Sequence, residues 1–374
     1  MASPIKKQKT TDKQWRWGII GSGKIAQDFA TAVCGVMNGA LGSVSSNPNA
    51  NMVITAVGAR KLQDAQKFAT QFQIKAAYGS YDAVAQDPNV DVVYVSTIHP
   101  QHKENMLLCL KNGKHVLCEK PFTVNSDEAK EVVALAREKK LFVMEAMWTR
   151  CFPVMAKANE LLKAGVIGRV RSVQCDFGFN GTKGAPRLWE PDMAGGSILD
   201  IGVYNIAFAS MVFGPQAPMA IAAVGELSDR GVDAQVSMSL KWVVVAVAHG
   251  CRYKDGLCSL SSSIVSPTPR EAVIIGSDGR IKIHGPFWHA SNSLTLSVEG
   301  KVDETLSFPF PDIKGPFCFV NSQCLAYEAE EVIRCLNAGV LESPKITLDE
   351  TLTIMQIMDK TRAIVGVSYP FEKK

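Results

Sequence analysis

Two charged residues, Glu119 and Lys120, follow the short apolar run His115–Cys118 and precede Pro121. The run is typical of a buried parallel strand, and ligands of open α/β sheets bind beyond the carboxyl ends of such strands. We therefore expect both side chains to face a crevice. An ammonium group in a partly dry cleft can lower the pKa of a neighbouring acid or polarise a hydroxyl group. The alternative is a solvated loop, so the hypothesis depends on the rest of the chain.

The beginning of the chain contains a phosphate-binding pattern. The apolar segment Trp15–Ile20 predicts a first strand, and the G-x-G-x-x-A turn from Gly21 to Ala26 follows it and leads into a helix. Gly21 permits a tight turn, and Gly23 lets the backbone approach a pyrophosphate at the amino terminus of the helix. Ala26 is small enough for close packing of helix and strand. This context predicts a dinucleotide held by Gly21, Ser22, Gly23, Lys24 and Ile25.

The end of the second predicted strand, Met52–Gly58, indicates which dinucleotide is bound. NAD sites usually carry an acidic residue here that binds the ribose 2′-hydroxyl group. This chain has Ala59 and Arg60 instead, and an arginine suits a 2′-phosphate, so we predict NADP. The alternative is that Arg60 and Lys61 only begin a solvated helix. The stretch Gly35–Asn51, rich in Gly, Ser and Asn, is interpreted as a surface insertion.

An apolar helix predicted to end near Phe213 contains a further candidate pair. Asp200 and Tyr204 are four residues apart and therefore share one face of this helix. A carboxylate buried among apolar residues needs a partner, because an isolated buried charge is costly. The alternative is a core pair with satisfied hydrogen bonds. If the pair faces Lys120 across a crevice, the three side chains can transfer a proton.

The composition excludes several classes of protein. The 374 residues suffice for two domains, and 47% hydrophobic with 20% charged residues is typical of a globular protein. A net charge of +4 with dispersed basic residues does not indicate nucleic-acid binding, and the cluster Lys6–Lys9 is interpreted as a solvated tail. The longest apolar runs are interrupted by Asp200 or Lys241, and the amino terminus has no signal-peptide core. We therefore expect no membrane contact and a cytoplasmic location.

Cysteine and histidine spacing gives no sign of a metal site. The ten cysteines occur singly, and we expect several to be small core residues in a reducing compartment. His99 and His102 resemble a metal-binding pair, but no third ligand is evident, so no metal is predicted. The cysteines expected in the core are Cys109, Cys118, Cys175 and Cys335.

The order of the predicted elements indicates two domains. Between Trp15 and about Glu145, strands and helices alternate, which predicts a doubly wound parallel sheet. After Met147, long β-like segments with turn signals predict an open, mainly antiparallel sheet in an α+β domain. The expected division is a disordered tail (1–13), a Rossmann domain (14–146) and a domain for substrate binding and dimerisation (147–374) that contains a helix over 349–366. The continuously apolar runs Ala220–Val224 and Val243–Val247 suggest that a second subunit covers one sheet face, as in a homodimer.

In combination these motifs resemble the glucose–fructose oxidoreductase, inositol dehydrogenase and rhizopine catabolism family of NAD(P)-dependent oxidoreductases. The resemblance covers the chain after its tail. Within the family it is greatest to the branch of dimeric dihydrodiol dehydrogenases and NADP-dependent D-xylose dehydrogenases. The stretches that carry the resemblance are 21–25, 77–81, 99–103, 119–121, 144–150 and 200–204. Many family members have histidine where this chain has Tyr204.

The resemblance implies an active site between the two domains and a cis bond before Pro121. The substrate would be a sugar such as D-xylose, oxidised at its anomeric carbon, or a trans-dihydrodiol. Tyr204 would accept a proton, although a phenol ordinarily titrates near pH ~10, and Lys120 would favour the phenolate while Asp200 orients Lys120 or the substrate. The cofactor would also contact Thr97, His99, His102, Glu119 and Lys120, and Trp148 with Arg150 would line its nicotinamide end.

Two other functions stay open. One is a reductase for sugars or anhydrofructose that runs the same chemistry toward the alcohol. The other is a non-catalytic NADP-binding regulator that kept the fold, although such a protein has no need for the pair Lys120 and Tyr204. The polar loop Gly181–Arg187 is expected to border the substrate.

Overall fold

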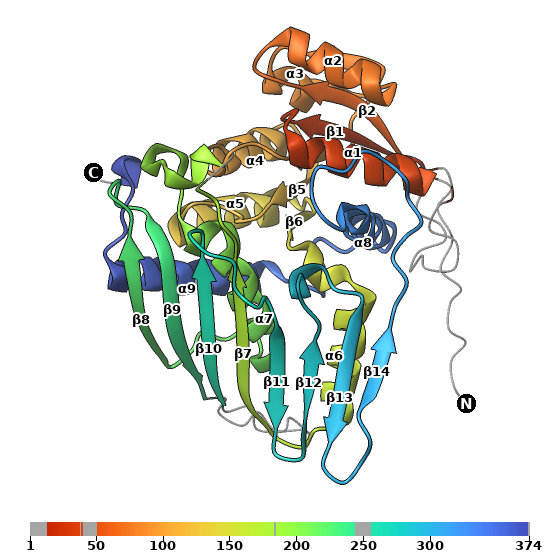
Figure 1. Cartoon of the computed structure of the whole chain (residues 1–374). Coiled ribbons are helices and arrows are strands. Elements are labelled where there is room, and N and C mark those ends of the chain that lie inside the picture. Colours follow the sequence, from red (N-terminus) through yellow and green to blue (C-terminus); the bar gives the residue numbers. More distant parts are fainter. Residues whose placement is uncertain (1–12, 38, 40–50, 183–184, 244–255, 373–374) are drawn as a thin grey trace.

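The computed structural model describes residues 13–37, 39, 51–182, 185–243 and 256–372. These residues form two β-sheets with their helices (Figure 1). Residues 1–12 of the predicted tail, most of the predicted insertion and residues 244–247 of the second apolar run lie outside the described residues. Gly35, predicted to begin the insertion, instead belongs to helix α1, because the apolar pattern of that helix continues to Met37.

The first sheet has six parallel strands in the order β3-β2-β1-β4-β5-β6, as predicted for a doubly wound domain. The sequence analysis missed β3, which has only three half-buried residues. The strand order reverses between β1 and β4, and the crevice at such a point binds ligands. The strands are β1 (Trp15–Ile20), β2 (Met52–Gly58), β3 (Ala76–Tyr78), β4 (Val92–Val95), β5 (His115–Glu119) and β6 (Val143–Ala146), and the helices are α1 (Lys24–Met37), α2 (Leu62–Phe72), α3 (Tyr81–Gln86), α4 (His102–Lys111) and α5 (Ser126–Lys139).

The second sheet has eight strands in the order β14-β13-β12-β11-β7-β10-β9-β8. It is antiparallel except where β10 pairs with β7, so the prediction of a mainly antiparallel sheet is confirmed. The strands are β7 (Val170–Gly178), β8 (Ala220–Leu227), β9 (Asp233–Trp242), β10 (Gly256–Ser263), β11 (Ala272–Gly276), β12 (Gly279–Ile283), β13 (Ser293–Val298) and β14 (Glu304–Ser307).

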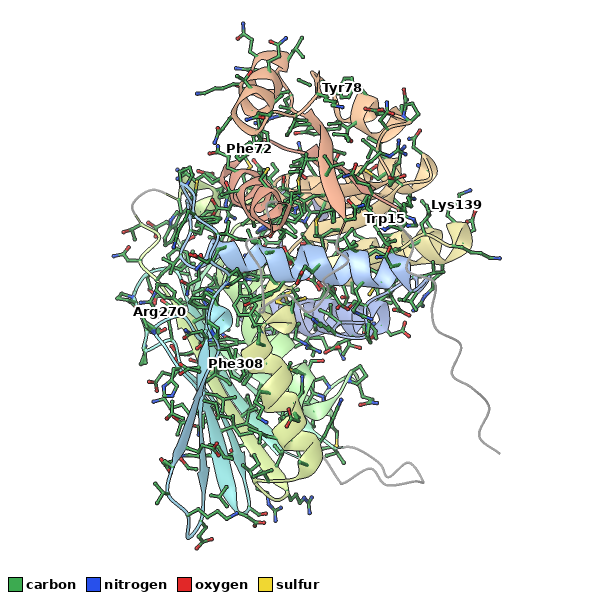
Figure 2. The ribbon with its side chains drawn as sticks, turned by 90° about the vertical axis from the view of Figure 1, so that its right-hand side faces the viewer. Trp15, Phe72, Tyr78, Lys139, Arg270 and Phe308 are labelled. Atoms are coloured by element: carbon green, nitrogen blue, oxygen red, sulfur yellow. The ribbon has the colours of Figure 1, made fainter. Side chains whose placement is uncertain are left out.

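Helices cover one face of the eight-stranded sheet. The helices α6 (Pro153–Ala164), α7 (Val203–Phe213) and α9 (Leu348–Val365) lie behind it in Figure 1, and the side view of Figure 2 shows α6 on one side of the strands. Side chains of β9 alternate accordingly. Met238 and Leu240 are buried, whereas Ser237 and Ser239 are exposed on the other face.

The end of the chain returns to the first sheet. Helix α8 (Leu325–Asn337) packs against α1, and Asn337 accepts a hydrogen bond from the Trp15 indole at 2.8 Å. The Asp28 carboxylate in α1 accepts the backbone amides of Cys318 and Phe319 at 2.7 and 2.9 Å. One cluster of buried apolar side chains runs through both halves of the molecule. The two halves of the chain therefore share one hydrophobic core, which continues on both sides of the site.

Among the described residues, a single helical stretch, 191–213, is long and apolar enough to cross a membrane. Its apolar 18-residue window is entirely buried within the protein, so it is a core helix. This is the run interrupted by Asp200.

Candidate active site

Most of the predicted site residues lie at one edge of the first sheet. The carboxyl ends of β1, β2, β4, β5 and β6 lead into Gly21, Ala59, Ser96, Lys120 and Met147, respectively. Parallel strands bring these five loops together at the same edge, where an open α/β sheet binds its ligand. The helix with Asp200 and Tyr204 approaches the edge from the second half of the chain, because the Lys120 ammonium donates a hydrogen bond to the Asp200 carbonyl at 2.6 Å.

The loop after β1 has the shape that a dinucleotide needs. Gly21 has φ +101°, and a Cβ atom there would lie 2.9 Å from the carbonyl oxygen of Ser96, so only glycine fits this turn. A Cβ atom on Gly23 would meet nothing within 4 Å, which leaves open space above the backbone. Helix α1 begins at Lys24, and the first amides of a helix have no acceptors within the helix. Ser22, Gly23, Lys24 and Ile25 thus surround a free helix end suited to a pyrophosphate.

Arg60 lies exposed at the end of β2, directly after the buried Ala59. Its charge acts on the nearby Tyr81 phenol, whose pKa burial raises and Arg60 lowers. Arg60 forms no ion pair within the part of the chain that the structure describes. The guanidinium group is therefore available to an anion at the place where the ribose of a dinucleotide binds.

Lys120 and Asp200 form the centre of the site. The Lys120 Nζ lies 3.6 Å from the Asp200 Oδ1, and the Arg187 guanidinium donates to the same oxygen at 2.7 Å. Burial disfavours the charged carboxylate, but Lys120 and Arg187 outweigh it and hold the pKa of Asp200 well below its usual range. Lys120 is thus the partner that the buried carboxylate needs. Arg187, from the loop expected to border the substrate, is a second partner.

Tyr204 lies beside this ion pair. The Trp148 indole donates a hydrogen bond to the Tyr204 hydroxyl at 3.0 Å, and the Lys120 Nζ is 5.1 Å from the centre of the tyrosine ring. Burial and the neighbouring Glu119 raise the pKa of the phenol well above 10, and the hydrogen bond from Trp148 opposes them only in part. We expected Lys120 to favour the phenolate. In the structure the ammonium group lies beside the Asp200 carboxylate, and the pKa of the phenol is raised because burial outweighs the effects that lower it.

A π-helical turn at Ile198–Gly202 positions Asp200 at the start of α7. Gly196 has φ +111°, and a Cβ atom there would lie 2.1 Å from the Asp233 carboxylate. That carboxylate accepts the Ser197 hydroxyl and the Ile198 amide at 2.8 and 2.6 Å, so it caps the beginning of the helix. Burial raises the pKa of Asp233 to about 6. The sequence analysis missed Asp233, since it lies on β9 and belongs to no motif.

Two buried side chains hold the turn that carries Lys120, whose bond to Pro121 is cis as the family resemblance implies. The His102 ring nitrogens lie 2.8 and 3.0 Å from the carbonyl oxygens of Pro121 and Thr97, while burial lowers the pKa of this histidine. The Glu145 carboxylate accepts the Phe122 amide at 3.0 Å, and burial raises its pKa to about 7. His102, which was predicted to contact the cofactor, thus has both ring nitrogens within hydrogen-bonding distance of backbone carbonyl groups.

Glu119, which was expected to face the crevice, is bound by a buried tyrosine. Its carboxylate accepts a hydrogen bond from the Tyr94 hydroxyl at 2.5 Å inside the first domain. Burial raises the pKa of Glu119, and burial together with Glu119 raises the pKa of the neighbouring Glu328 well above its ordinary value. Glu119 is the last residue of β5, and Lys120 lies beyond the end of the strand.

His99 and Thr97 lie near the centre of the site. The His99 Nδ1 lies 3.2 Å from the Ala194 carbonyl oxygen, and its Nε2 is 4.0 Å from the Asp200 Oδ1. Burial and the cation of Arg187 lower the pKa of His99 well below its ordinary value, so the ring is neutral. The Thr97 hydroxyl accepts the Asn105 amide at 3.1 Å. Over the described residues no group of three His, Cys, Asp or Glu side chains could hold a metal ion.

Arg150 is engaged elsewhere in the protein. Its guanidinium group forms two hydrogen bonds to the Glu350 carboxylate in α9, at 2.9 and 3.1 Å, and donates to the Ala207 carbonyl at 2.9 Å. Both side chains are more than nine-tenths buried. Arg150 is thus occupied within the protein, whereas Trp148, predicted to line the nicotinamide end with it, contacts Tyr204.

An aromatic wall that the sequence analysis missed completes the site. The His289 ring stacks on Phe177 with ring centres 4.1 Å apart, and it lies 5.2 Å from the Tyr204 ring and 6.2 Å from Trp148. Phe177 comes from β7, and His289 comes from a short turn after β12. No sequence motif marks these two positions.

Comparison with known proteins identifies the relatives of this chain. Residues 15–147 match the oxidoreductase family with an NAD-binding Rossmann fold, and residues 155–282 match the GFO/IDH/MocA C-terminal domain. Trans-1,2-dihydrobenzene-1,2-diol dehydrogenase of Mus musculus is 41% identical over 96% of this chain and 99% of its own. The enzyme of that name from Homo sapiens is 38% identical over the same shares of the two chains.

Solved structures share the fold over nearly the whole chain. Levoglucosan dehydrogenase in complex with NADH and levoglucosan has a TM-score of 0.78 at 18% identity, and covers 95% of this chain and 98% of its own. A 3-ketoreductase from Actinomadura kijaniata with TDP-benzene and NADP has a TM-score of 0.70 at 24% identity, and covers 94% and 98%. The family resemblance inferred from the motifs is confirmed.

The position of Arg150 gives a prediction that distinguishes a structural role of this residue from a role in cofactor binding. Arg150→Met leaves the Glu350 carboxylate buried without its cation, so the free energy of unfolding should fall by about 3 kcal/mol. The affinity for NADP should stay within twofold of the unmodified protein. Urea unfolding and fluorescence titration with the cofactor measure the two quantities, with Arg150→Lys as the control that keeps a charge. A loss of cofactor affinity without a loss of stability would assign Arg150 to the cofactor site.

Proposed function

This chain belongs to the GFO/IDH/MocA family of oxidoreductases, and from that premise we propose that it oxidises a hydroxyl group of a sugar or a vicinal diol with NADP as the hydride acceptor. The observation that carries the proposal is the cluster of Lys120, Asp200 and Tyr204 at the sheet edge that also holds the Gly21–Ile25 loop. Candidate substrates are D-xylose, oxidised at its anomeric carbon, and trans-1,2-dihydrobenzene-1,2-diol, the substrate in the names of relatives about 40% identical. The chain is a dehydrogenase of this family.

Tyr204 is the proposed proton acceptor. The Trp148 indole fixes the position of its hydroxyl group and, as a donor, stabilises the phenolate form. When bound, the cofactor supplies an acceptor for the hydride, and the protein contributes position and electric field. Lys120, held by Asp200, presents a fixed positive charge to the oxygen that loses its proton.

The protonation state of Tyr204 also supports a second candidate, the reverse reaction. Burial raises the pKa of the phenol, so Tyr204 carries its proton at neutral pH and is ready to act as an acid toward a developing alkoxide. A sugar or carbonyl reductase that uses NADPH would employ this state directly. Initial rates measured in both directions at pH 7 decide between the two.

Removing the Tyr204 hydroxyl group tests the acid–base assignment. Tyr204→Phe keeps the packing of the ring, and turnover should fall by about 10²–10⁴-fold, the usual contribution of acid–base catalysis. Because the pKa of the phenol is raised, the rate of oxidation by the unmodified protein should increase with pH from 7 to 10. Lys120→Met should move this increase to higher pH, since it removes a cation 5.1 Å from the ring.

Steady-state kinetics with NADP and each candidate substrate measure these effects. Tyr327→Phe is a matched control, because its hydroxyl group donates a hydrogen bond to the Pro309 carbonyl at 3.4 Å, and it should leave turnover within about twofold. Near-normal turnover of both site variants would make Tyr204 and Lys120 structural residues. A protein that binds NADP but oxidises and reduces nothing would be a regulator.

Arg60 is the residue proposed to select NADP over NAD. Arg60→Ala should weaken NADP binding by about 1.5–3 kcal/mol, the value of a charge-assisted hydrogen bond, and should barely change NAD binding. Titration of both cofactors by intrinsic fluorescence measures the difference, with Lys61→Ala as the neighbouring control. Equal losses for both cofactors would show that Arg60 does not bind the 2′-phosphate.

We also propose that the protein is a homodimer joined through the uncovered face of the eight-stranded sheet. Small residues line this face where β8, β9 and β10 run side by side, including the registered row of Ala222, Ser239 and Ser259. Val224 and Leu257 on the same strands are 79% and 56% exposed. A weakly charged face of this kind suits a second copy of itself around a two-fold axis. The free thiols of the described cysteines suit the predicted cytoplasmic location.

A charge placed on this face tests the dimer. Val224→Glu should shift the protein from the mass of a dimer to that of a single chain, because it places two carboxylates in a desolvated contact. Val302→Glu, at a position 93% exposed between β13 and β14, should leave the dimer intact. Sedimentation at micromolar protein measures both masses. An unmodified protein that sediments as a monomer would contradict the proposal.

A further inference from the structure

His289 occupies a fixed position in the wall of the site. The turn that carries it, Trp288–Ala290, forms side-chain hydrogen bonds with three other segments of the chain. The Thr149 hydroxyl donates to the His289 carbonyl at 2.6 Å, and Asn321 donates to the Ala290 carbonyl at 2.9 Å. The Trp288 indole donates to the Asp176 carbonyl at 2.8 Å. The imidazole is therefore held in place before any substrate arrives.

One ring nitrogen of this imidazole, Nδ1, lacks a partner among the described residues. The side chain is more than nine-tenths buried, and its Nδ1 is fully buried with no hydrogen bond among the described residues. Its other contacts are aromatic: it stacks on Phe177 and approaches Tyr204 and Phe287. A buried polar atom without a partner destabilises a fold, and phenylalanine would make the same stacking contact without that cost. The choice of histidine therefore points to a hydrogen bond made with a bound molecule.

The charge state of His289 limits what it can do. Burial, together with the cations of Lys120 and Arg270, lowers its pKa to about 3. The ring is neutral at physiological pH, so it offers one N–H donor and one acceptor and no charge. It cannot act as the acid or base of the reaction, but it matches the donor and acceptor character of a hydroxyl group.

We propose that His289 binds the hydroxyl group next to the one that reacts, and so makes the protein selective for vicinal diols over single alcohols. The inference rests on the proposed function, in which the reacting hydroxyl group lies at Tyr204. The imidazole and phenol rings are 5.2 Å apart, so hydroxyl groups on adjacent carbons can reach one each. Both candidate substrates have this arrangement, since a cyclic D-xylose carries hydroxyl groups on its first two carbons.

The test compares each diol with its analogue that lacks the neighbouring hydroxyl group: D-xylose with 2-deoxy-D-xylose, and trans-cyclohexane-1,2-diol with cyclohexanol. The measured quantity is the ratio of kcat/KM for the diol to that for its analogue. His289→Phe keeps the stacking and should lower this ratio about tenfold, as expected for one lost hydrogen bond. His289→Asn keeps a donor and an acceptor and should restore part of it. His284→Phe is the control, because His284 pairs with Thr295 on β13 at 2.8 Å and should leave the ratio unchanged.

Each outcome decides the proposal. An equal loss for the diol and its analogue leaves the ratio unchanged, and it would overturn the proposal by reducing His289 to a packing residue. Thermal unfolding of each variant shows whether the protein is folded. If the unmodified protein oxidises none of these compounds, the proposed function fails, and tryptophan fluorescence of the NADPH complex then decides the role of His289. If the diol binds more tightly than its analogue and His289→Phe abolishes this difference, the proposal is supported. Equal or absent binding of the two compounds overturns it.

Discussion

The site depends on one buried carboxylate. Asp200 lies in a helical segment whose neighbours Ile198, Leu199 and Ile201 are all buried, and a carboxylate in such surroundings would be protonated without compensation. Lys120 and Arg187 supply that compensation from two other segments. Removing the charge of Asp200 would leave two cations close together, so each member of the group requires the others. The ion pair therefore joins the two halves of the chain where a ligand would bind.

Other buried polar groups hold the segments that supply these charges. Asp233 caps the helix of Asp200, and Glu145 and His102 hold the turn after Lys120. Each bonds to backbone atoms, so its effect is to fix the path of the chain. A catalytic group must be held to within a fraction of an ångström, and such supporting contacts provide that precision. The burial that raises the pKa values of Glu145 and Asp233 is the cost of this rigidity.

The sequence predicted what is encoded locally. Apolar runs, the glycine turn and the spacing of Asp200 and Tyr204 depend on neighbouring residues, so the parallel sheet and the meeting of Lys120 with Asp200 were predictable. Contacts between distant segments were not. Phe177, Asp233 and His289 reach the site from β7, β9 and a turn after β12, respectively, and only the tertiary fold brings them there. Arg150 is the reverse case. It lies beside a site motif and was therefore predicted to line the cofactor, but it is bound by Glu350, 200 positions later in the chain.

The charge balance of the cluster explains how a protonated tyrosine can serve the reaction. Lys120 and Arg187 carry two positive charges, Asp200 carries one negative charge, and His99 is neutral because burial lowers its pKa. The group thus has one surplus positive charge. Glu119 would cancel this surplus if it were ionised, and burial opposes its ionisation by raising its pKa. Fixed positive charge in a site shielded from water stabilises an oxygen that loses its proton far more than it would in water. The same surplus favours an alkoxide on the substrate and a phenolate on Tyr204, so it lowers the barrier to proton transfer between them in either direction.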